Sequence, residues 1–454
     1  MTVVELTAST EPGPARQQTI VLLTGNSLSN NPRAFKEASA LARAGYRVQL
    51  LGAWLDPDFK SRDEALLPEL PFDFIPVLDM TAIDGLKRVD QFTRRLHRRA
   101  AQYAHDLVGW ESQRQFGGTV EPLLREALRR PASLYIAHSE VGLCVAAELL
   151  RRGLPVGVDM EDWFSEDLLP AARRRRPLGL LRDLERLILS HGVWAACPSE
   201  AMATALAETY GCRRPTVIYN AFSWSDRVFL EGEVLDRRDR AIASLYWFSQ
   251  TIGPGRGIEE LLAALPLLRG DCEIHLRGRL IPGFDRWIAE RLPEPWRGRV
   301  FLHDLVNTTD LLPRIAEHDI GFAGEPRDPA NKDLTVSNKI LHYLLGGLAV
   351  VASDTKGQQE VARRAPEAVT LYRAGDARDL ARQLDLLIES PARRMAAQRA
   401  ALAAAQVTFC WEREGDRLIA AMMETLHSSS ETPSRDAIRD LDCEAIATAA
   451  HDSV

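Results

Sequence analysis

Short apolar runs rich in β-branched residues recur along the chain and alternate with stretches whose apolar residues have helical spacing. Such runs predict strands buried on both faces, and their alternation with helices predicts parallel sheets. We therefore expect an α/β protein of the doubly wound kind. The predicted strands are 19–24, 47–52, 134–138, 156–159, 193–197 and 216–218 in the first half, and 241–247, 273–277, 300–302, 319–323, 348–353 and 369–371 in the second.

A polar and charged stretch around 225–240 separates the two sets of strands. The two ends of the chain contain Pro, Ser, Thr and charged residues, a composition typical of segments that form no packed core. The expected division is a flexible leader over 1–18, a first domain over 19–235, a second domain over 236–407, a closing helix over 408–427 and a flexible tail over 428–454.

Composition narrows the class of protein. The 454 residues are 46% apolar and 26% charged, and the net charge of −7 argues against a dedicated nucleic-acid binder. Six cysteines without C-x-x-C pairs indicate neither a disulfide framework nor a zinc site. No apolar run reaches membrane-spanning length and no signal peptide is evident, so we expect a soluble, cytoplasmic protein. The P-loop, the dinucleotide-binding G-x-G-x-x-G after the first strand and the G-x-S-x-G elbow are all missing.

The segment 335–361 carries the most informative chemical pattern. Ser337 is a typical helix N-cap, and Asn338 and Lys339 follow it in the first helical turn. The free amide groups and positive dipole end of such a turn favour a phosphate or ribose hydroxyls. Gly357 then opens a second helix at the carboxyl end of a strand, the edge where open α/β sheets bind ligands. An ordinary strand–helix unit without a phosphate is the alternative.

Polar residues also follow strands of the first half. The loop amides of Gly25 and Asn26 can approach a phosphate or an acceptor closely, and Arg33 can point into the same crevice. A solvated helix charge is the alternative for Arg33 and the preferred interpretation of Lys36. His138 ends a strand, which predicts a position at the rim of an interdomain cleft.

A further strand ends in three carboxylates, Asp159, Glu161 and Asp162. They could bind the acceptor, or a metal if one is used. The alternative is that they are helix N-terminal charges, which favour that position because of the helix dipole.

Five segments resemble, in chain order, the GT-B glycosyltransferases, and family 4 in particular. They are LLTGNSLSNNPRAFKEASALARAGYRV, LYIAHSEVGL, VGVDMEDWFSED, SLYWFSQTIGPGRGIEELLAAL and SNKILHYLLGGLAVVAS. The matches extend from about Thr19 to Leu426. This resemblance implies two Rossmann-like domains that face a cleft, with the C-terminal helix crossing back to the first domain.

The resemblance also implies how the donor diphosphate is bound. Arg256 would pair with it bidentately, and Gly257 would let the backbone come close. The family often has a second basic residue five positions earlier, but that residue is Thr251 here. Lys339, helped by Arg277 or Arg279, is therefore expected to carry the remaining charge. A tight turn before a helix is the alternative for this segment.

The chain departs from the family at its pair of glutamates, which brackets the nucleotide sugar. The two positions are Leu334 and His342 here. Glu325 or Asp333, from a longer loop, is the candidate replacement for the first carboxylate. His342 and Glu360 are expected to contact nucleotide or sugar hydroxyls, although a neutral imidazole offers one donor and one acceptor only.

The implied activity is transfer of a sugar from a nucleotide-diphosphate sugar, used as co-substrate, to an unidentified small-molecule, glycan or lipid-linked acceptor. The resemblance implies retention of anomeric configuration and no obligatory metal or other cofactor. Arg256, Lys339 and helix N-termini would stabilise the departing diphosphate, and Glu325 is a catalytic candidate as the replacement carboxylate. His138 would contact a donor-sugar hydroxyl, and Asp159 and Glu161 would lie on the acceptor side.

Two other classes of function stay open, a non-catalytic GT-B protein that binds a nucleotide or a partner, and a GT-B sugar-nucleotide epimerase. The basic stretches RRLHRRAAQYA and AARRRRPLGLLRDLERLILS suit an anionic membrane surface, which would place the protein at the inner face of the membrane. They are equally consistent with a solvated loop followed by a core-facing helix. The sequence does not set the oligomeric state.

Overall fold

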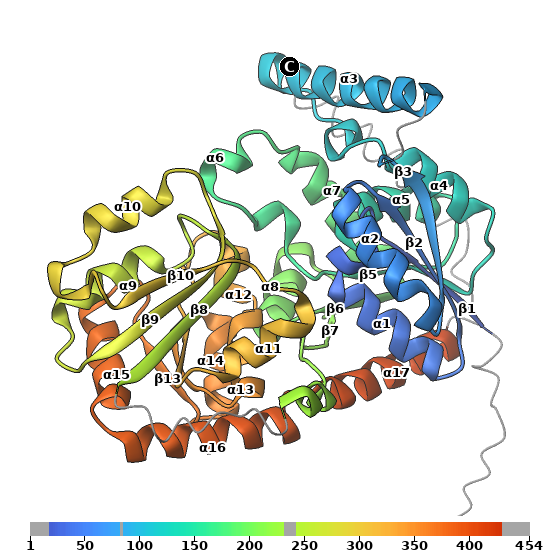
Figure 1. Cartoon of the computed structure of the whole chain (residues 1–454). Coiled ribbons are helices and arrows are strands. Elements are labelled where there is room, and N and C mark those ends of the chain that lie inside the picture. The colour runs from blue at the N-terminus through green and yellow to red at the C-terminus, as the bar shows by residue number, and fades with distance from the viewer. Residues whose placement is uncertain (1–17, 82–84, 231–241, 429–454) are drawn as a thin grey trace, which may run out of the picture.

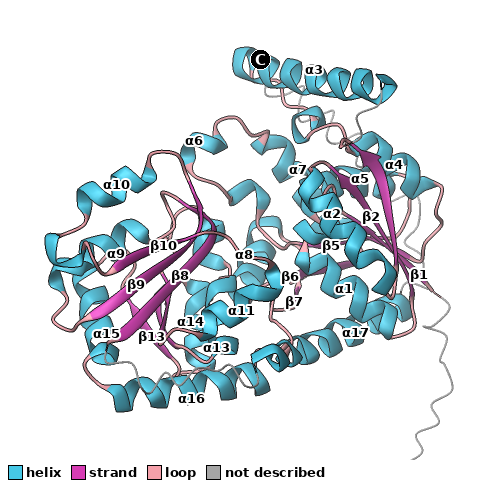
Figure 2. Cartoon of the chain, in the orientation of Figure 1, coloured by secondary structure: helices cyan, strands magenta, loops and turns pink. Residues whose placement is uncertain are grey.

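A computed structural model describes residues 18–81, 85–230 and 242–428, and in it two sheets stand side by side (Figure 1). The first sheet has seven strands in the order β3-β2-β1-β4-β5-β6-β7, and the second has six in the order β10-β9-β8-β11-β12-β13. The paired strands of both sheets run parallel. Helices flank each sheet (Figure 2), as a parallel sheet requires because each crossover lays a helix on one of its faces.

The strands are β1 Thr19–Leu23, β2 Arg47–Trp54, β3 Asp73–Asp79, β4 Leu134–Ala137, β5 Val156–Asp159, β6 Trp194–Cys197, β7 Thr216–Val217, β8 Ala243–Ile252, β9 Cys272–Leu280, β10 Val300–His303, β11 Ile320–Ala323, β12 Ala349–Ser353 and β13 Val369–Tyr372. The helices are α1 Pro32–Arg43, α2 Pro57–Leu66, α3 Gly85–Val108, α4 Val120–Leu128, α5 Ser139–Arg151, α6 Pro170–Arg173, α7 Leu178–His191, α8 Glu200–Tyr210, α9 Ile258–Ala264, α10 Phe284–Arg291, α11 Thr308–Ala316, α12 Ala330–Leu334, α13 Asn338–Gly346, α14 Lys356–Arg364, α15 Ala377–Ile388, α16 Pro391–Val407 and α17 Trp411–Ser428.

The central strands are buried on both faces. Every residue of β4, β5 and β12 is buried, which explains their unbroken apolar runs. Strand order reverses between β1 and β4 in the first sheet and between β8 and β11 in the second. The crossovers leave in opposite directions at such a point, so a crevice opens at the carboxyl ends of the strands.

Close packing fixes α13 at the crevice of the second sheet. The Tyr343 ring lies directly over Gly321 of β11, where an added Cβ would come within 2.3 Å of a ring carbon. The Tyr343 hydroxyl donates a hydrogen bond of 3.1 Å to the Phe322 carbonyl oxygen. Glycine is therefore needed at position 321 so that the helix can approach the strand this closely.

The last helix, α17, returns to the first domain, as expected (Figure 1). Its Leu418 and Met422 belong to the same buried apolar cluster as Leu41 of α1. Glu414 of α17 accepts a 2.8 Å hydrogen bond from the backbone N–H of Tyr219, just after β7. The chain therefore crosses between the domains a second time.

One strand, β3, is missing from the predicted set. It is an edge strand whose residues are at most partly buried, and it contains Pro76, so it shows neither a continuous apolar run nor a clean alternation. Of the predicted leader only Gln18 falls within the described residues, and of the predicted tail only Ser428 does; the boundary at 235–236 lies outside them. Among the described residues, no helix is both long enough and apolar enough to cross a membrane.

Candidate active site

The start of α13 is built as expected. Ser337 is its N-cap, and the Ser337 hydroxyl oxygen accepts a 3.3 Å hydrogen bond from the backbone N–H of Lys339. The same hydroxyl donates to Oε1 of Glu325 at 3.1 Å. The side-chain oxygen of Asn338 accepts a 3.0 Å hydrogen bond from Asn220 of the first domain. The helix start therefore lies where the two domains meet.

A group of cations lies around the ion pair of Glu325 and Lys339. The buried Lys339 ammonium pairs with Oε1 of Glu325, and burial lowers the pKa of Lys339 while Glu325 opposes that shift. The charges of Lys332 and Arg256 lower the pKa of Lys339 further, which shows that both lie within electrostatic range. Lys339 and Lys332 both act on Glu325, and Lys332 also acts on Asp162 of the first domain. The surplus positive charge at the carboxyl edge of the second sheet suits a diphosphate.

Glu325 stays ionised in this group. Burial alone would raise its pKa, but Lys339 and then Lys332 outweigh burial and hold the pKa below its usual range. Its backbone N–H donates a 2.9 Å hydrogen bond to the Ser353 hydroxyl at the end of β12. The carboxylate is therefore fixed between β11 and α13, where it orients Lys339.

Arg256 is the cation of this group that is best placed to bind an anion. Its Nη1 donates a 2.9 Å hydrogen bond to the hydroxyl of Ser249, and in the described part of the chain no carboxylate pairs with it. Gly257, at φ +83°, precedes α9, and a Cβ there would lie 2.3 Å from the Gly324 carbonyl oxygen. The close approach that we expected at Gly257 is therefore to the β11–α12 loop of the chain itself.

A second close approach brings α14 to the same place. A Cβ on Gly357 would lie 2.3 Å from the carbonyl oxygen of Thr335, which precedes α13. Only glycine leaves room for this contact. The helix starts of α13 and α14 are consequently held next to one another, as the sequence predicted.

Arg33 does not point into the crevice, so that expectation is wrong. Its side chain is 3% exposed, its Nε lies 2.5 Å from Oδ2 of Asp159, and its Nη1 donates to the Ile218 carbonyl oxygen at 2.8 Å. Burial would lower the Arg33 pKa, but Asp159 and Glu37 together raise it. The carboxylate responds in the opposite direction: burial would raise the Asp159 pKa, but Arg33 brings it to about 2. The buried ion pair therefore links α1 to the carboxyl end of β5.

Lys36 is not a solvated charge either. Its ammonium donates hydrogen bonds of 2.6 Å to the side-chain oxygen of Asn220 and to the carbonyl oxygen of Ala221. It also lies 4.8 Å from the ring centroids of Phe222 and Trp411. Burial lowers the Lys36 pKa to about 7. This lysine therefore links α1 to the segment after β7 and to the start of α17.

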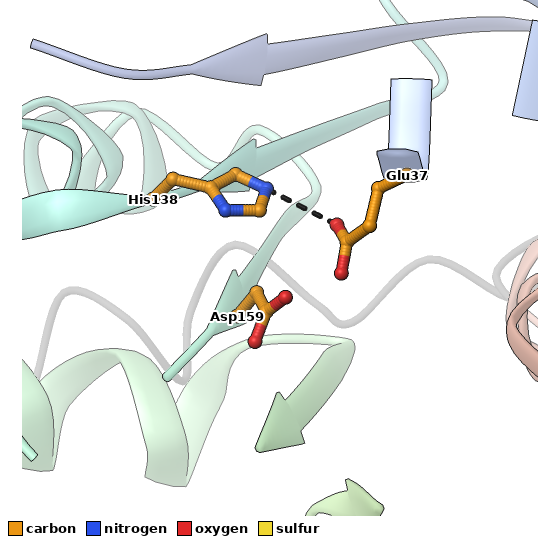
Figure 3. Close-up of side chains that lie close together, drawn as sticks. All are labelled: Glu37, His138 and Asp159. Atoms are coloured by element: carbon orange, nitrogen blue, oxygen red, sulfur yellow. Dashed lines mark ion pairs between the residues drawn. The ribbon is translucent and has the colours of Figure 1, made fainter. Parts of the chain in front are cut away.

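His138 is fully buried, whereas we expected it at the rim of the cleft. Its Nε2 lies 3.1 Å from Oε2 of Glu37, and Asp159 lies close to both side chains (Figure 3). Burial lowers the His138 pKa and therefore favours the neutral imidazole. The next residue, Ser139, has φ +62°, and its hydroxyl accepts a 3.3 Å hydrogen bond from the Gly25 N–H. In this arrangement the imidazole cannot reach a donor sugar in the cleft.

The cluster of Glu37, His138 and Asp159 contains the residue types that ligate metals, with candidate ligand atoms within 4.8 Å of one another. However, the Arg33 Nε already lies 2.5 Å from Asp159 and 3.9 Å from Glu37, and its charge occupies the place that a cation would take. Burial and the neighbouring Asp159 raise the Glu37 pKa well above its usual range. A protonated Glu37 balances this cluster without an ion.

The other two acids after β5 have different partners, and among the described residues only Asp162 is bonded to the second domain. Glu161 accepts a 3.3 Å hydrogen bond from the Asn31 side chain, and burial raises the Glu161 pKa to about 7. Asp162 accepts a 2.8 Å hydrogen bond from Asn331 of the second domain. The acceptor-side role of Glu161 stays a prediction. Asp159 is buried and paired with Arg33, so an acceptor contact would require it to leave this partner.

Asn26, the other loop residue with a predicted donor contact, is held locally. Its backbone N–H donates a 3.0 Å hydrogen bond to the Thr24 hydroxyl, and its carbonyl oxygen accepts one of 3.0 Å from the Ala53 N–H. The donor-binding role of Asn26 stays a prediction.

Three predicted donor-binding side chains are engaged elsewhere. Glu360 accepts backbone hydrogen bonds at the start of α8, of 3.0 Å from Glu200 and 2.6 Å from Ala201. His342 packs on Phe222 at 3.5 Å between ring centroids, and burial lowers its pKa to about 3. Arg277 donates to the Tyr246 hydroxyl at 2.8 Å and to the carbonyl oxygen of Asp304 at 2.7 Å. A donor contact by any of these side chains requires that it leave these partners.

A cavity of about 440 Å³ opens beside the interdomain crevice. Its first-domain side has apolar residues, two arginines and one glutamate, and an aspartate of the second domain completes it. The lining residues are Glu166, Leu168, Pro170, Arg173, Arg174, Leu178 and Asp328.

Solved structures of other proteins share this architecture. HepE from Anabaena in complex with UDP-glucose superposes with a TM-score of 0.61 at 18% identity, covering 90% of this chain and 100% of HepE. Sucrose-phosphate synthase from Thermosynechococcus elongatus gives a TM-score of 0.64 at 14% identity, over 91% of this chain and 100% of that one. The fold is GT-B.

The same fold is shared by a protein of another class. A putative UDP-N-acetylglucosamine 2-epimerase from Listeria monocytogenes gives a TM-score of 0.52 at 12% identity, covering 92% of this chain and 98% of that one. No protein-family model matches the chain, and no curated protein matches it. At identities this low, the superpositions establish the fold but not the reaction, which depends on the side chains of the site.

Two functional candidates were missed by the sequence analysis. Lys332 lies in a short helix before the N-cap of α13, and only the fold brings it to Glu325. Glu37 lies one turn after Arg33 on α1, and that i, i+4 spacing was the available signal for an ion pair.

Proposed function

We propose that this protein transfers a sugar from a nucleotide-diphosphate sugar to an acceptor, with retention of configuration and no obligatory metal. The observation that carries the proposal is the group of three cations, Arg256, Lys332 and Lys339, in which Lys339 pairs with Glu325 and Arg256 pairs with no described carboxylate. It lies beside two helix starts at the carboxyl edge of the second sheet of a GT-B fold, where nucleotides bind in open α/β sheets.

The chemistry follows from that surplus of positive charge. When the bond between the anomeric carbon and the diphosphate breaks, negative charge develops on the leaving oxygen, and Arg256 and Lys339 stabilise it. The acceptor hydroxyl forms the new bond to the same carbon on the same face, and its proton passes to the departing diphosphate oxygen. No separate base is needed. Glu325 holds Lys339 in position and keeps it charged.

The acceptor is a small molecule, a glycan or a lipid-linked molecule that enters from the first-domain side. Glu161, whose pKa of about 7 lies near neutrality, is the candidate acceptor-side carboxyl. Membership of glycosyltransferase family 4 and peripheral contact with the inner face of a membrane belong to the same proposal.

A sugar-nucleotide epimerase is the second candidate, because a putative enzyme of that class shares the fold. It would consume the donor without an acceptor. A non-catalytic protein would bind a nucleotide and leave the sugar attached.

Release of nucleoside diphosphate from UDP-, GDP-, ADP- and TDP-sugars, followed with and without a panel of acceptors, separates these classes. We expect release that depends on acceptor and falls at least about a hundredfold in Arg256→Ala. The matched control is Arg393→Ala, an exposed arginine of α16 far from the crevice. Release or rearrangement without acceptor would favour the epimerase, and no turnover of any donor would overturn the enzymatic proposal.

A further inference from the structure

Helix α3 exposes a row of large apolar side chains. Val89, Phe92, Leu96, Tyr103 and Leu107 are 64%, 68%, 53%, 66% and 65% exposed, respectively. With 3.6 residues per turn, these five positions fall within an arc of about 60° of the helix surface. Just after the helix, a tryptophan at position 110 is also exposed. We call the five helical residues the α3 stripe.

The opposite side of α3 attaches it to the first domain. Ala101 is buried, and Arg94 donates a 2.5 Å hydrogen bond to the Gly118 carbonyl oxygen. The helix lies at the upper edge of the molecule in Figure 1, outside the layers of the two domains. The α3 stripe therefore faces outward, and the apolar surface it presents is of the kind that marks an interaction site.

The stripe is bordered by positive charge, although the whole chain carries −7. Arg95 and Arg99 are exposed beside it, and the exposed Asp106 lies between them around the helix, so this border keeps a net positive charge. Arg98 lies near Arg176 in the turn after α6, since burial lowers the Arg176 pKa and the charge of Arg98 lowers it further. Two exposed arginines at positions 174 and 175 belong to that turn, so the basic border continues from α3 to the cavity beside the crevice.

A second copy of the chain fits this surface poorly. In a coiled coil, apolar residues repeat every 3.5 residues, and the seam that runs through Val89, Phe92 and Leu96 would include positions 99 and 106. Those positions are Arg99 and Asp106. An outward apolar arc with a basic border and an interfacial tyrosine is instead typical of helices that lie in the plane of a membrane surface.

We propose that the α3 stripe inserts into the interface of an anionic phospholipid bilayer, with Arg95, Arg99, Arg174 and Arg175 facing the lipid headgroups. This places the cavity beside the crevice close to the membrane, where an acceptor with a lipid anchor would enter. The inference rests on the proposed function, whose membrane contact it assigns to one helix. The two can fail separately, because vesicle binding is measured without glycosyl transfer.

Cosedimentation of the full chain with vesicles tests the proposal. We expect binding to mixed phosphatidylglycerol–phosphatidylcholine vesicles that weakens as salt is raised, and at least about tenfold weaker binding to pure phosphatidylcholine. The double variant Phe92→Glu/Leu96→Glu should lose at least about tenfold in affinity for the anionic vesicles. The matched control is Met395→Glu/Val407→Glu on α16, whose side chains are 40% and 59% exposed at the opposite edge of the molecule (Figure 1).

The substituted side chains are exposed, so all variants should keep the melting temperature of the parent. A second variant, Arg95→Glu/Arg99→Glu, should weaken binding to anionic vesicles and reduce its salt dependence. Wild-type protein that fails to bind at low salt would overturn the proposal, as would equal loss in the α16 control. A wild-type dimer that Phe92→Glu/Leu96→Glu dissociates, without vesicle binding, would assign the stripe to a second copy instead.

Discussion

Two groups of charged side chains lie at the carboxyl edges of the two sheets, and they differ in charge balance. In the first domain, Arg33 faces Glu37 and Asp159, and all three are at most 2% exposed. In the second domain, Lys339 pairs with Glu325, and the charges of Lys332 and Arg256 both act on Lys339. Arg256 has no carboxylate partner among the described residues.

The comparison shows that an arginine after a strand is not enough to predict an anion site. The number of carboxylates that already pair with the cations decides where an anion can bind. The Arg33 group satisfies its own charge and joins β5 to α1, so it has a structural role. The Glu325 group keeps positive charge that a diphosphate could neutralise. We expect substitutions in the first group to change stability and those in the second to change ligand binding.

The largest expected effect is on folding. Arg33→Met would leave the carboxylate of Asp159 buried without its partner, which we expect to lower the free energy of unfolding by about 3–5 kcal/mol. Urea denaturation at neutral pH measures this, with the exposed Arg393→Met as the control, expected to lie within about 0.5 kcal/mol of the parent. A loss below about 1 kcal/mol in Arg33→Met would show that the first group is not a paired structural unit.

The next effect is on binding. Arg256→Ala should weaken the preferred nucleoside diphosphate by about tenfold to a hundredfold, since hydrogen bonds to charged groups contribute about 1.5–3 kcal/mol. Isothermal titration calorimetry measures the affinity. The melting temperature without ligand should stay near that of the parent, because Arg256 has one hydrogen bond to Ser249 and no ion pair to lose in the described part of the chain. A large fall in melting temperature with unchanged affinity would reverse the assignment of the two groups.

A pH effect is expected at Glu161. Its folded pKa of about 7 lies above the ordinary 4.5, so the folded state holds a proton that the unfolded chain releases. The resulting stability is complete below pH 4.5 and is lost as the pH rises to 7. The free energy of unfolding of the parent should therefore fall relative to Glu161→Gln across this window, by about 1–2 kcal/mol after allowance for solvent screening of this partly exposed carboxyl. Parallel curves from urea titrations at several pH values would contradict the raised pKa.

The smallest effect is expected at Lys332. It acts on Glu325 and Lys339 through its charge, so Lys332→Ala should weaken diphosphate binding by about threefold to tenfold. Raising the salt concentration should shrink the difference between parent and variant, because partly exposed charges are screened. Calorimetry at two salt concentrations measures this, and a difference that persists undiminished at high salt would indicate a direct contact between Lys332 and the diphosphate.

The sequence predicted the strands that are buried on both faces, because an apolar run and its flanking turns are local features. It also predicted the N-cap at Ser337, which depends on the residues beside it. It missed β3, because an edge strand that is at most partly buried does not require a continuous apolar run.

The site was predicted less well, for a physical reason. The partners of Arg33, namely Asp159 and the Ile218 carbonyl, lie at the ends of strands far along the chain, so no local pattern shows that this arginine is already paired. The same holds for Glu360, whose hydrogen-bond donors belong to the other domain. Motif position identifies a candidate residue, while burial and pairing follow from the tertiary fold.

The most direct test of the account is a thermal-shift screen of the protein and Arg256→Ala against UDP, GDP, ADP, TDP and CMP with their common sugars. A ligand that binds the folded state alone raises the melting temperature by mass action. We predict a selective rise with one nucleoside diphosphate that Arg256→Ala abolishes, which would identify the base and locate the diphosphate at the second domain. No rise at millimolar concentration, or an equal rise in Arg256→Ala, would contradict the assignment of the Glu325 group as the donor site.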